Sequence, residues 1–182
     1  MNMRAAAVRV SFPFILGVAV GVTTGVAGAA TVNCTGGTCF GTGSADTING
    51  SGGDDTIAAG DGGDTVFGNG GKDLIFGEQV ADDLRGGPGY DSSVDANGNI
   101  FGVNGGNGQD NVNGEGGDDV VIGGSNEDKL YGEAGNDFLF GDGDGVVDKY
   151  WGGDGTDNCY ITSGLDQIQG GCENVIVTGY YV

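Results

Sequence analysis

The sequence predicts an all-β chain wound as a parallel β-roll, a solenoid in which short strands stack in register. Three observations lead to this fold class. Aspartate returns every nine residues, an aliphatic residue stands two positions after most of these aspartates, and glycine supplies 43 of the 182 residues. So high a glycine content is ordinarily typical of disordered segments. A disordered chain keeps no register, however, and a fixed period of this kind indicates stacked structural repeats.

The first 29 residues differ in composition from the rest, and we interpret residues 1–29 as a signal peptide. Two arginines accompany an apolar run, residues 10–22, and the small-residue tail 27–29 suits cleavage before Ala30. We therefore expect an extracellular protein, secreted through an N-terminal signal peptide, with an uncleaved anchor as the alternative. No later segment is apolar enough to suggest a membrane span.

Charge restricts the partners of this chain. It has 6 basic and 26 acidic residues, a net charge of -20. Removal of Arg4 and Arg9 with the signal peptide would leave 4 basic and 26 acidic residues, a net charge of -22. Such a charge repels nucleic acids and anionic membrane surfaces, and it attracts cations.

No part of the sequence marks a catalytic site. Histidine is absent, which excludes histidine-based triads. The acidic pairs all belong to the repeat, and no stretch long enough for a separate enzyme domain remains beside it. We therefore expect a protein that is not an enzyme.

Four cysteines lie in two tight pairs near the ends of the mature chain. In an exported protein this arrangement favours two local disulfides, Cys34–Cys39 and Cys159–Cys172. Three connectivities are formally possible, and the local one is preferred because pairing across the body requires the two ends to meet. A zinc site is the rival interpretation, but it needs four converging thiolates or histidine ligands.

Between the cysteine pairs we expect the roll itself, residues 42–158. Its aspartates stand at 46, 55, 64, 73, 82 and 91 and, after an interruption, at 110, 119, 128 and 137; Asp148 and Asp157 continue the series less regularly. The apolar residues two positions later are expected to form a narrow core. They are Ile48, Ile57, Val66, Ile75, Leu84, Val112, Val121, Leu130 and Leu139, and Ser93 interrupts the series.

The repeat is interrupted in two places and is expected to end in atypical units. Residues 95–104 and 142–151 break the phase and are expected to form loops or bulged coils. Solenoids need atypical end units to cover their cores and strand edges, so we expect an N-terminal cap at residues 30–41 and a C-terminal cap at residues 159–182. The side chains expected to seal the last coil or to cover the core are Tyr150, Trp151, Tyr160, Val175, Val177 and Tyr180.

Several repeats follow one pattern closely, namely GGPGYDSSV from Gly86, GGNGQDNVN from Gly105, GEGGDDVVI from Gly114 and GEAGNDFLF from Gly132. The pattern G-G-x-G-x-D-x-U-x, with U a large aliphatic residue, is that of the RTX repeat. Over roughly 120 residues the chain resembles the RTX, or hemolysin-type, calcium-binding repeat family of secreted bacterial proteins. The resemblance implies a β-roll with two repeats per coil and several Ca²⁺ ions bound at its turns.

Stacking itself also indicates a cation. Coils at the ~4.8 Å strand spacing bring aspartates of every second repeat together along one edge of the roll. Two carboxylates at ~5 Å repel by roughly 1 kcal/mol even in water. Ca²⁺ accepts six to eight oxygens from carboxylates and backbone carbonyls, so it suits such an edge. The candidate metal ligands are Asp46, Asp55, Asp64, Asp73, Asp82, Asp91, Asp110, Asp119, Asp128, Asp137, Asp148 and Asp157.

Individual repeats depart from the pattern. Glycine at the first and fourth positions is expected to provide positive φ. Since Ser44, Val80 and Asn126 replace the fourth-position glycine, their aspartates are expected to bind weakly or not at all. Lys72 is expected to offset part of the charge of the neighbouring Asp73. The acidic residues expected to face solvent are Asp54, Asp61 and Asp118.

These observations predict a secreted calcium-binding protein whose folding is coupled to extracellular calcium. One alternative is that aspartate is present only as a good turn residue, although that preference does not fix one position. The functional alternatives are adhesion, a cell-envelope matrix role, or an ice- or surface-binding solenoid. Any cell-surface or polysaccharide partner is left unassigned by the sequence.

Overall fold

The computed structural model describes residues 28–94, 100–141, 144–162 and 165–178. These residues form 18 strands, and within them there is no helix of the length and apolar character needed to cross a membrane. Residues 1–27 of the predicted signal peptide, residues 95–99 and Tyr180 lie outside the described part of the chain.

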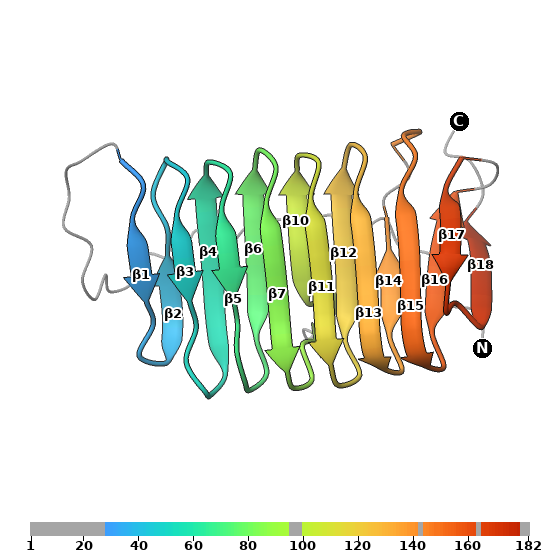
Figure 1. Ribbon diagram of the computed structural model, residues 1–182, viewed down its shortest axis with the longest axis horizontal. Coiled ribbons are helices and arrows are strands. Elements are labelled where there is room, and N and C mark those ends of the chain that lie inside the picture. The colour runs from blue at the N-terminus through green and yellow to red at the C-terminus, as the bar shows by residue number, and fades with distance from the viewer. Residues whose placement is uncertain (1–27, 95–99, 142–143, 163–164, 179–182) are drawn as a thin grey trace.

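Figure 1 shows a flattened coil whose strands alternate between two sheets, which confirms the predicted parallel β-roll. Each sheet has eight strands, and neighbouring strands within it are parallel. Sheet A consists, in spatial order, of β1 (Thr31–Asn33), β3 (Thr47–Asn49), β5 (Thr65–Phe67), β7 (Asp83–Pro88), β11 (Asn111–Gly116), β13 (Lys129–Gly135), β15 (Lys149–Gly155) and β17 (Gln167–Gly170). Sheet B consists of β2 (Gly37–Phe40), β4 (Asp55–Asp61), β6 (Leu74–Gln79), β10 (Val103–Asn107), β12 (Val120–Ser125), β14 (Phe138–Phe140), β16 (Asn158–Thr162) and β18 (Asn174–Thr178).

The core is a file of side chains enclosed between the two sheets. All nine aliphatic residues predicted for it have no exposed surface. Ser93 does not occupy the place that the spacing assigned to it, because Val103 pairs with Ile75 on one side and with Val121 on the other. A three-residue strand buries little by itself, so this continuous file exists only because the coils stack.

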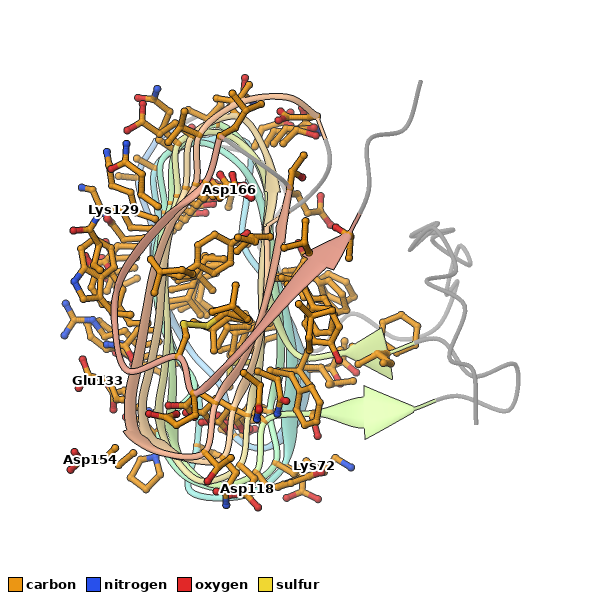
Figure 2. The ribbon with its side chains drawn as sticks, turned by 90° about the vertical axis from the view of Figure 1, so that its right-hand side faces the viewer. Lys72, Asp118, Lys129, Glu133, Asp154 and Asp166 are labelled. Carbon is orange, nitrogen blue, oxygen red and sulfur yellow. A yellow bond between two sulfur atoms is a disulfide. The ribbon has the colours of Figure 1, made fainter. Side chains whose placement is uncertain are left out.

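The stretch predicted to be irregular, residues 95–104, is corrected at its end, because Val103 and Asn104 already belong to strand β10 of the roll. The short strands β8 (Ser93–Val94) and β9 (Ile100–Phe101) are antiparallel, and Figure 2 shows them projecting sideways from the coil. Leu84 still pairs with Val112, although 28 residues separate them instead of the usual 18 between paired strands. The insertion is therefore an outward excursion at one turn.

A second insertion, within residues 142–151, is smaller. Leu130 pairs with Tyr150 across 20 residues, and Tyr150 continues the core file with no exposed surface. Trp151, which was also expected to cover core, points outward from sheet A instead, and its ring stacks on Tyr131 with 4.6 Å between the centroids. Alternation along β15 explains this outcome, because adjacent residues of a strand face opposite sides.

Glycine serves the turns in two different ways. Positive φ occurs at the fourth repeat position, as expected, but its companion is the second position and not the first. In one repeat, for example, Gly60 and Gly62 have φ of 105° and 128°. The first position needs glycine for space, because a Cβ added to Gly86 would lie only 2.2 Å from Oδ2 of Asp91.

Both predicted disulfides are present, Cys34–Cys39 at the N-terminal end and Cys159–Cys172 at the C-terminal end. Cys159 belongs to the buried core file, and the other three cysteines pack against it. The local pairing extends the core into both end coils.

Of the residues expected to seal the last coil, Tyr160 is arranged differently from that expectation. Tyr160 stacks on Phe140, with 4.3 Å between ring centroids, on the outward face of sheet B. Val175 and Val177 of β18 are 46% and 55% exposed. Tyr160 therefore does not close the end of the core, whereas Val175 pairs in register with the buried Cys159 and Val177 with Ile161, on the core side of the last strand.

Candidate metal centre

The repeat aspartates form two rows, one along each turn edge of the roll, as their spacing predicts. Within a row, the backbone N–H of one aspartate donates to Oδ1 of the aspartate in the next coil, at 2.7–3.0 Å. The first row contains Asp46, Asp64, Asp82, Asp110, Asp128, Asp148 and Asp166. The second row contains Asp55, Asp73, Asp91, Asp119, Asp137 and Asp157.

The second carboxylate oxygen, Oδ2, differs from Oδ1 in its hydrogen bonding. All twelve predicted aspartates are buried, with at most 3% of their surface exposed. Oδ2 is buried and accepts no hydrogen bond within the described structure in Asp64, Asp73, Asp82, Asp91, Asp110, Asp119, Asp137 and Asp157. A buried acceptor without a donor costs about 1–3 kcal/mol, and more when it is charged. Each row is therefore a file of anionic oxygens that a cation would stabilise.

Carbonyl oxygens of the neighbouring coil lie beside these carboxylates. A Cβ added to Gly77 would lie 2.3 Å from Oδ2 of Asp82 and 2.4 Å from the carbonyl oxygen of Gly105. The first-position glycine thus leaves open a space that a carboxylate of one coil and a carbonyl of the next coil both face. Two oxygens from different coils converge there without any side chain between them.

Burial makes the charged form of these carboxylates unfavourable. Loss of hydration is the largest cause of the raised pKa values, and hydrogen bonds from the backbone oppose it. At Asp82, the carboxylates of Asp110 and Asp64 raise the pKa further. The repulsion expected from the sequence is thus present but secondary. The pKa is raised to about 7 for Asp82, Asp91 and Asp137, and to about 6 for Asp73, Asp110 and Asp119.

The basic side chains do not neutralise the rows. The ion pairs Arg85–Asp83 and Lys149–Glu127 join residues of the outer surface. Lys72 does not offset the charge of Asp73 as expected, because its side chain points away from the coil (Figure 2) and its Nζ lies 5.8 Å from the centroid of the Tyr90 ring. Among the described residues, no three acidic or cysteine side chains gather into a metal-binding cluster. A cation in these turns would therefore depend on backbone carbonyls for most of its ligands.

Comparison with protein-family models identifies the repeat. The model for the RTX calcium-binding nonapeptide repeat matches residues 40–75, 59–92 and 114–145. These are RTX calcium-binding repeats. A search of curated proteins found no match to the chain.

The RTX turns of this chain suit Ca²⁺ in the type of donor that they offer. Ca²⁺ takes carboxylate and carbonyl oxygens in flexible geometry and does not need nitrogen or sulfur ligands. The buried Oδ2 atoms and the neighbouring carbonyls are such oxygens, and no histidine is present in the chain. The residues present therefore fit the ion that the family binds.

Each RTX row contains one acidic residue more than was predicted from the sequence. Asp166 accepts a hydrogen bond from the backbone N–H of Asp148 at 3.0 Å, and Glu173 accepts one from Asp157 at 2.9 Å. Asp166 stands nine residues after Asp157 and two before Ile168, so the repeat spacing itself contained the signal. Glu173 breaks that spacing and has a longer side chain, so no sequence signal indicated it.

Two of the three atypical RTX repeats keep a left-handed residue at the fourth position, whereas Ser44 does not have positive φ. Val80 and Asn126 have φ of 74° and 88°, the left-handed conformation of the glycines that they replace. Their aspartates also keep their places in the row. Asp54, Asp61 and Asp118 are exposed, as predicted. Whether substitution at the fourth position weakens metal binding stays a prediction.

Proposed function

We propose that this protein binds several Ca²⁺ ions between the coils of its roll and that its role is not catalytic. The observation that supports this most directly is the set of eight buried Oδ2 atoms in the two rows that accept no hydrogen bond within the described structure. The proposed ligands are the repeat aspartates from Asp64 to Asp157 together with turn carbonyl oxygens. We assign the two N-terminal turns, at Asp46 and Asp55, separately below.

The residues of each turn prepare a place for the ion. The backbone N–H of the preceding coil holds Oδ1, which fixes the orientation of the carboxylate, as in the bond from Asp64 to Asp82 at 2.7 Å. The first-position glycine keeps the space beside Oδ2 free of side chains. A bound divalent cation supplies the positive charge that these anionic oxygens otherwise lack.

Binding and folding are coupled in this proposal. A ligand that binds only the folded chain adds its binding free energy to the stability of the fold. At neutral pH and low calcium, the buried carboxylates disfavour the roll, so the array stays unfolded inside the cell. After secretion through the N-terminal signal peptide, extracellular calcium folds it.

The test is a calcium titration of the chain without its first 29 residues, followed by circular dichroism and by calorimetry. In chelator the spectrum of most of the chain should be that of a coil, and millimolar Ca²⁺ should convert it to β structure. Magnesium is the control, since it demands tighter geometry and gives up its water reluctantly. A chain that takes up no calcium in any state contradicts the proposal.

A second candidate function, adhesion to an uncharged surface, is favoured by the outward face of sheet B. In all eight strands of that sheet the residues on either side of the core position are uncharged, although the chain has a net charge of -20. The outward positions hold Thr38, Phe40, Thr56, Ala58, Leu74, Phe76, Gly102, Asn104, Val120, Ile122, Phe138, Phe140, Asn158, Tyr160, Asn174 and Ile176. Of these, Gly102, Asn104, Val120 and Ile122 are buried, so the accessible part of the face lies on the strands to either side of them. Sheet A, by contrast, presents Asp83, Arg85, Lys129 and Lys149.

Sedimentation with an insoluble polysaccharide such as chitin, in the presence of calcium, tests this second function. Phe138→Asp on sheet B should abolish binding, because it places a charge on the uncharged face. Asn113→Asp adds the same charge to sheet A and should leave binding unchanged. Equal binding by both variants and the parent chain, or no binding at all, rejects adhesion through sheet B.

A further inference from the structure

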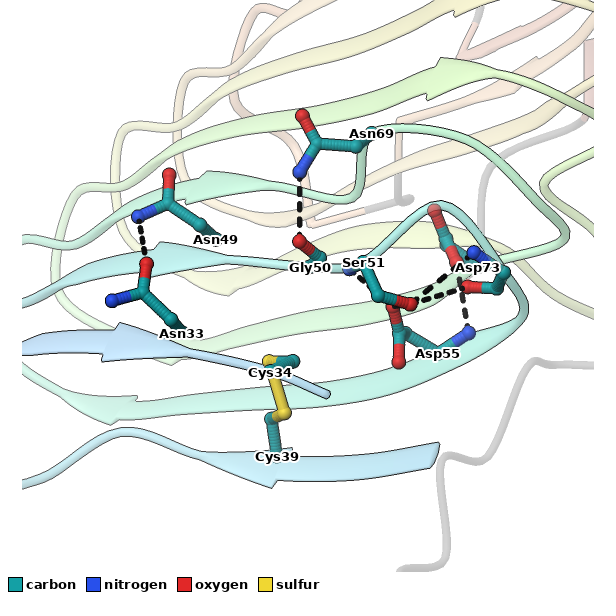
Figure 3. The surroundings of a disulfide bond; sticks show 10 residues. Asn33, Cys34, Cys39, Asn49, Gly50, Ser51, Asp55, Asn69 and Asp73 are labelled. Carbon is teal, nitrogen blue, oxygen red and sulfur yellow. Dashed lines mark hydrogen bonds between the residues drawn. A yellow bond between two sulfur atoms is a disulfide. The ribbon is translucent and has the colours of Figure 1, made fainter. Parts of the chain in front are cut away.

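The RTX turns of this chain are of two kinds, which differ in what the aspartate Oδ2 contacts. In the first turn, Oδ2 of Asp46 accepts hydrogen bonds from the backbone N–H and the hydroxyl of Thr42, at 2.6 and 2.8 Å. In the second turn, Oδ2 of Asp55 accepts the corresponding bonds from Ser51, at 2.7 and 2.8 Å (Figure 3). We call these two turns, residues 41–46 and 50–55, the closed turns.

In the interior turns the residue four positions before the aspartate has the opposite sign of φ. Its φ is positive in Gly60, Asn69, Glu78, Gly87, Gly106, Glu115, Gly124, Glu133 and Gly153. Neither Thr42 nor Ser51 has positive φ. Four of the nine interior residues are not glycine, and such residues rarely adopt this conformation. The open form therefore belongs to the turn itself, and it leaves Oδ2 without a donor in the eight aspartates named above.

The closed arrangement recurs at the other end of the molecule. Thr162 stands four residues before Asp166, and its backbone N–H donates to Oδ2 of Asp166 at 2.6 Å. Threonine or serine at the second turn position thus accompanies a hydrogen-bonded Oδ2 in three separate turns. Threonine or serine at this position therefore goes with the closed turn in both end coils of the roll.

Building on the proposed calcium function, we propose that Thr42 and Ser51 take the place of an ion. The closed turns bind no Ca²⁺, and the coil that contains them is folded in the metal-free protein. A hydroxyl and an N–H already supply Oδ2 with two donors, so a cation would have to displace them. In Asp46 the other oxygen is also satisfied, by the N–H of Ala30 at 2.7 Å. In Asp55 the other oxygen, Oδ1, is buried and accepts no hydrogen bond within the described structure, so the second closed turn is satisfied at Oδ2 alone.

The same coil also has the hydrogen-bond donors to which the next coil binds. The disulfide Cys34–Cys39 fixes its N-terminal side. On its other side, the N–H groups of Asp46 and Asp55 donate to Asp64 and Asp73, the first aspartates of the open turns. The closed coil is therefore a template, and calcium adds the interior coils to it in sequence.

Calcium stoichiometry tests the assignment of sites. Asp46→Asn and Asp82→Asn make the same change in the same row, in a closed and an open turn. Asp82→Asn should remove at least one bound ion per chain, measured by equilibrium dialysis in excess calcium, whereas Asp46→Asn should remove none. Equal losses in the two variants overturn the proposal. If neither the variants nor the parent chain bind calcium, the proposed function has failed instead.

Hydrogen exchange in chelator tests the template independently. The amides of Cys34 and Thr47, which bond to Asn49 and Ala30 within the first coil, should be protected, while those of Lys129 and Phe138 exchange freely. Uniform exchange along the chain overturns the template, even if calcium binding is intact.

The hydroxyl groups can be removed without altering the carboxylates. The double variant Thr42→Val, Ser51→Ala should lower the metal-free protection of the first coil by roughly tenfold to a hundredfold, since it deletes hydrogen bonds to charged groups. Thr47→Val with Thr65→Val, on the outer face of sheet A, is the matched control and should leave protection unchanged. Equal protection in both pairs rejects a role for the hydroxyls.

Discussion

Asp55 and Asp73 lie in adjacent coils of one row, and the N–H of Asp55 donates to Asp73, yet their environments differ. Oδ2 of Asp55 has two donors from Ser51, while Oδ2 of Asp73 has none in the described structure. The residue four positions before the aspartate makes this difference. A repeat that looks uniform in sequence therefore contains turns in which Oδ2 is hydrogen-bonded within the turn and turns in which Oδ2 has no donor in the described structure.

The largest effect that separates the two kinds of turn should be that of pH on the metal-free protein. Burial raises the pKa of Asp82, Asp91 and Asp137 from 3.8 to about 7. Because the folded-state pKa is the higher one, protonation favours folding. This contribution is complete below about pH 3.8 and is lost as the pH rises through about 7. In chelator, the interior coils should therefore show more β structure at pH 4 than at pH 7.5 by circular dichroism.

Two comparisons sharpen that experiment. Protection of the closed coil, measured by hydrogen exchange, should change little over the same pH range. Calcium-saturated protein should show the opposite trend and lose stability in acid, since protons compete with the metal for carboxylates. A metal-free array that is more folded at pH 7.5 than at pH 4 would contradict the role assigned to the buried carboxylates.

The next largest effect should come from filling the space beside an open carboxylate. Gly77→Ala places a methyl group 2.3 Å from Oδ2 of Asp82 and 2.4 Å from the carbonyl of Gly105. We expect a loss of about 1–3 kcal/mol in the free energy of unfolding with calcium, measured by urea titration, because the site is overpacked. Gly52→Ala, in a closed turn with no atom within 4 Å of the added methyl, should change stability by less than about 1 kcal/mol.

Removal of the N-terminal disulfide should weaken the closed coil selectively. The bond joins residues only five apart in sequence, so the loop-entropy model gives a loss of about 2 kcal/mol. Cys34→Ser with Cys39→Ser should lower the protection of first-coil amides in chelator, measured by hydrogen exchange. The calcium affinity of the interior turns should be unchanged, and an equal loss at both places would remove the distinction between the coils.

The smallest effect concerns a strained residue in an open turn. Val80 adopts φ of 74°, which is unfavourable for a β-branched side chain. Val80→Gly should raise the unfolding free energy of the calcium-bound protein by about 1 kcal/mol. Val80→Ala retains the steric penalty and should give a smaller gain in the same urea titration. If glycine gives no gain over alanine, the left-handed conformation is not costly there.

The nine-residue period was sufficient to predict the roll, the core file and the two rows of aspartates, and the two tight cysteine pairs in a chain expected to be exported predicted both disulfides. The first three of these features depend on residue spacing alone, since each coil repeats the geometry of the previous one. Val103 could not be assigned to the core in the same way, because the excursion before it destroys the count. Glu173 was missed for a similar reason, as it stands only seven residues after Asp166.

Turn chemistry was less accessible to sequence reasoning. Positive φ was expected at the first repeat position because glycine is frequent there, but the cause is the carboxylate that folds back over it, as Asp91 does over Gly86. No role was predicted for Thr42 or Ser51. Only the path of the backbone shows that their hydroxyls reach the aspartate four residues later.

The hairpin β8–β9 has a consequence for how such a molecule changes over time. Asp82 donates to Asp110 at 2.8 Å across 28 residues, as closely as Asp110 donates to Asp128 across 18. The hydrogen bonds along the row of aspartates therefore set the register between adjacent coils, whatever the length of the chain that connects them. Doubling the length of a flexible loop costs only about 0.6 kcal/mol in closure entropy. Extra segments can thus be inserted at a turn edge, which adds new surface to the protein while the hydrogen bonds between the aspartates of the row are kept.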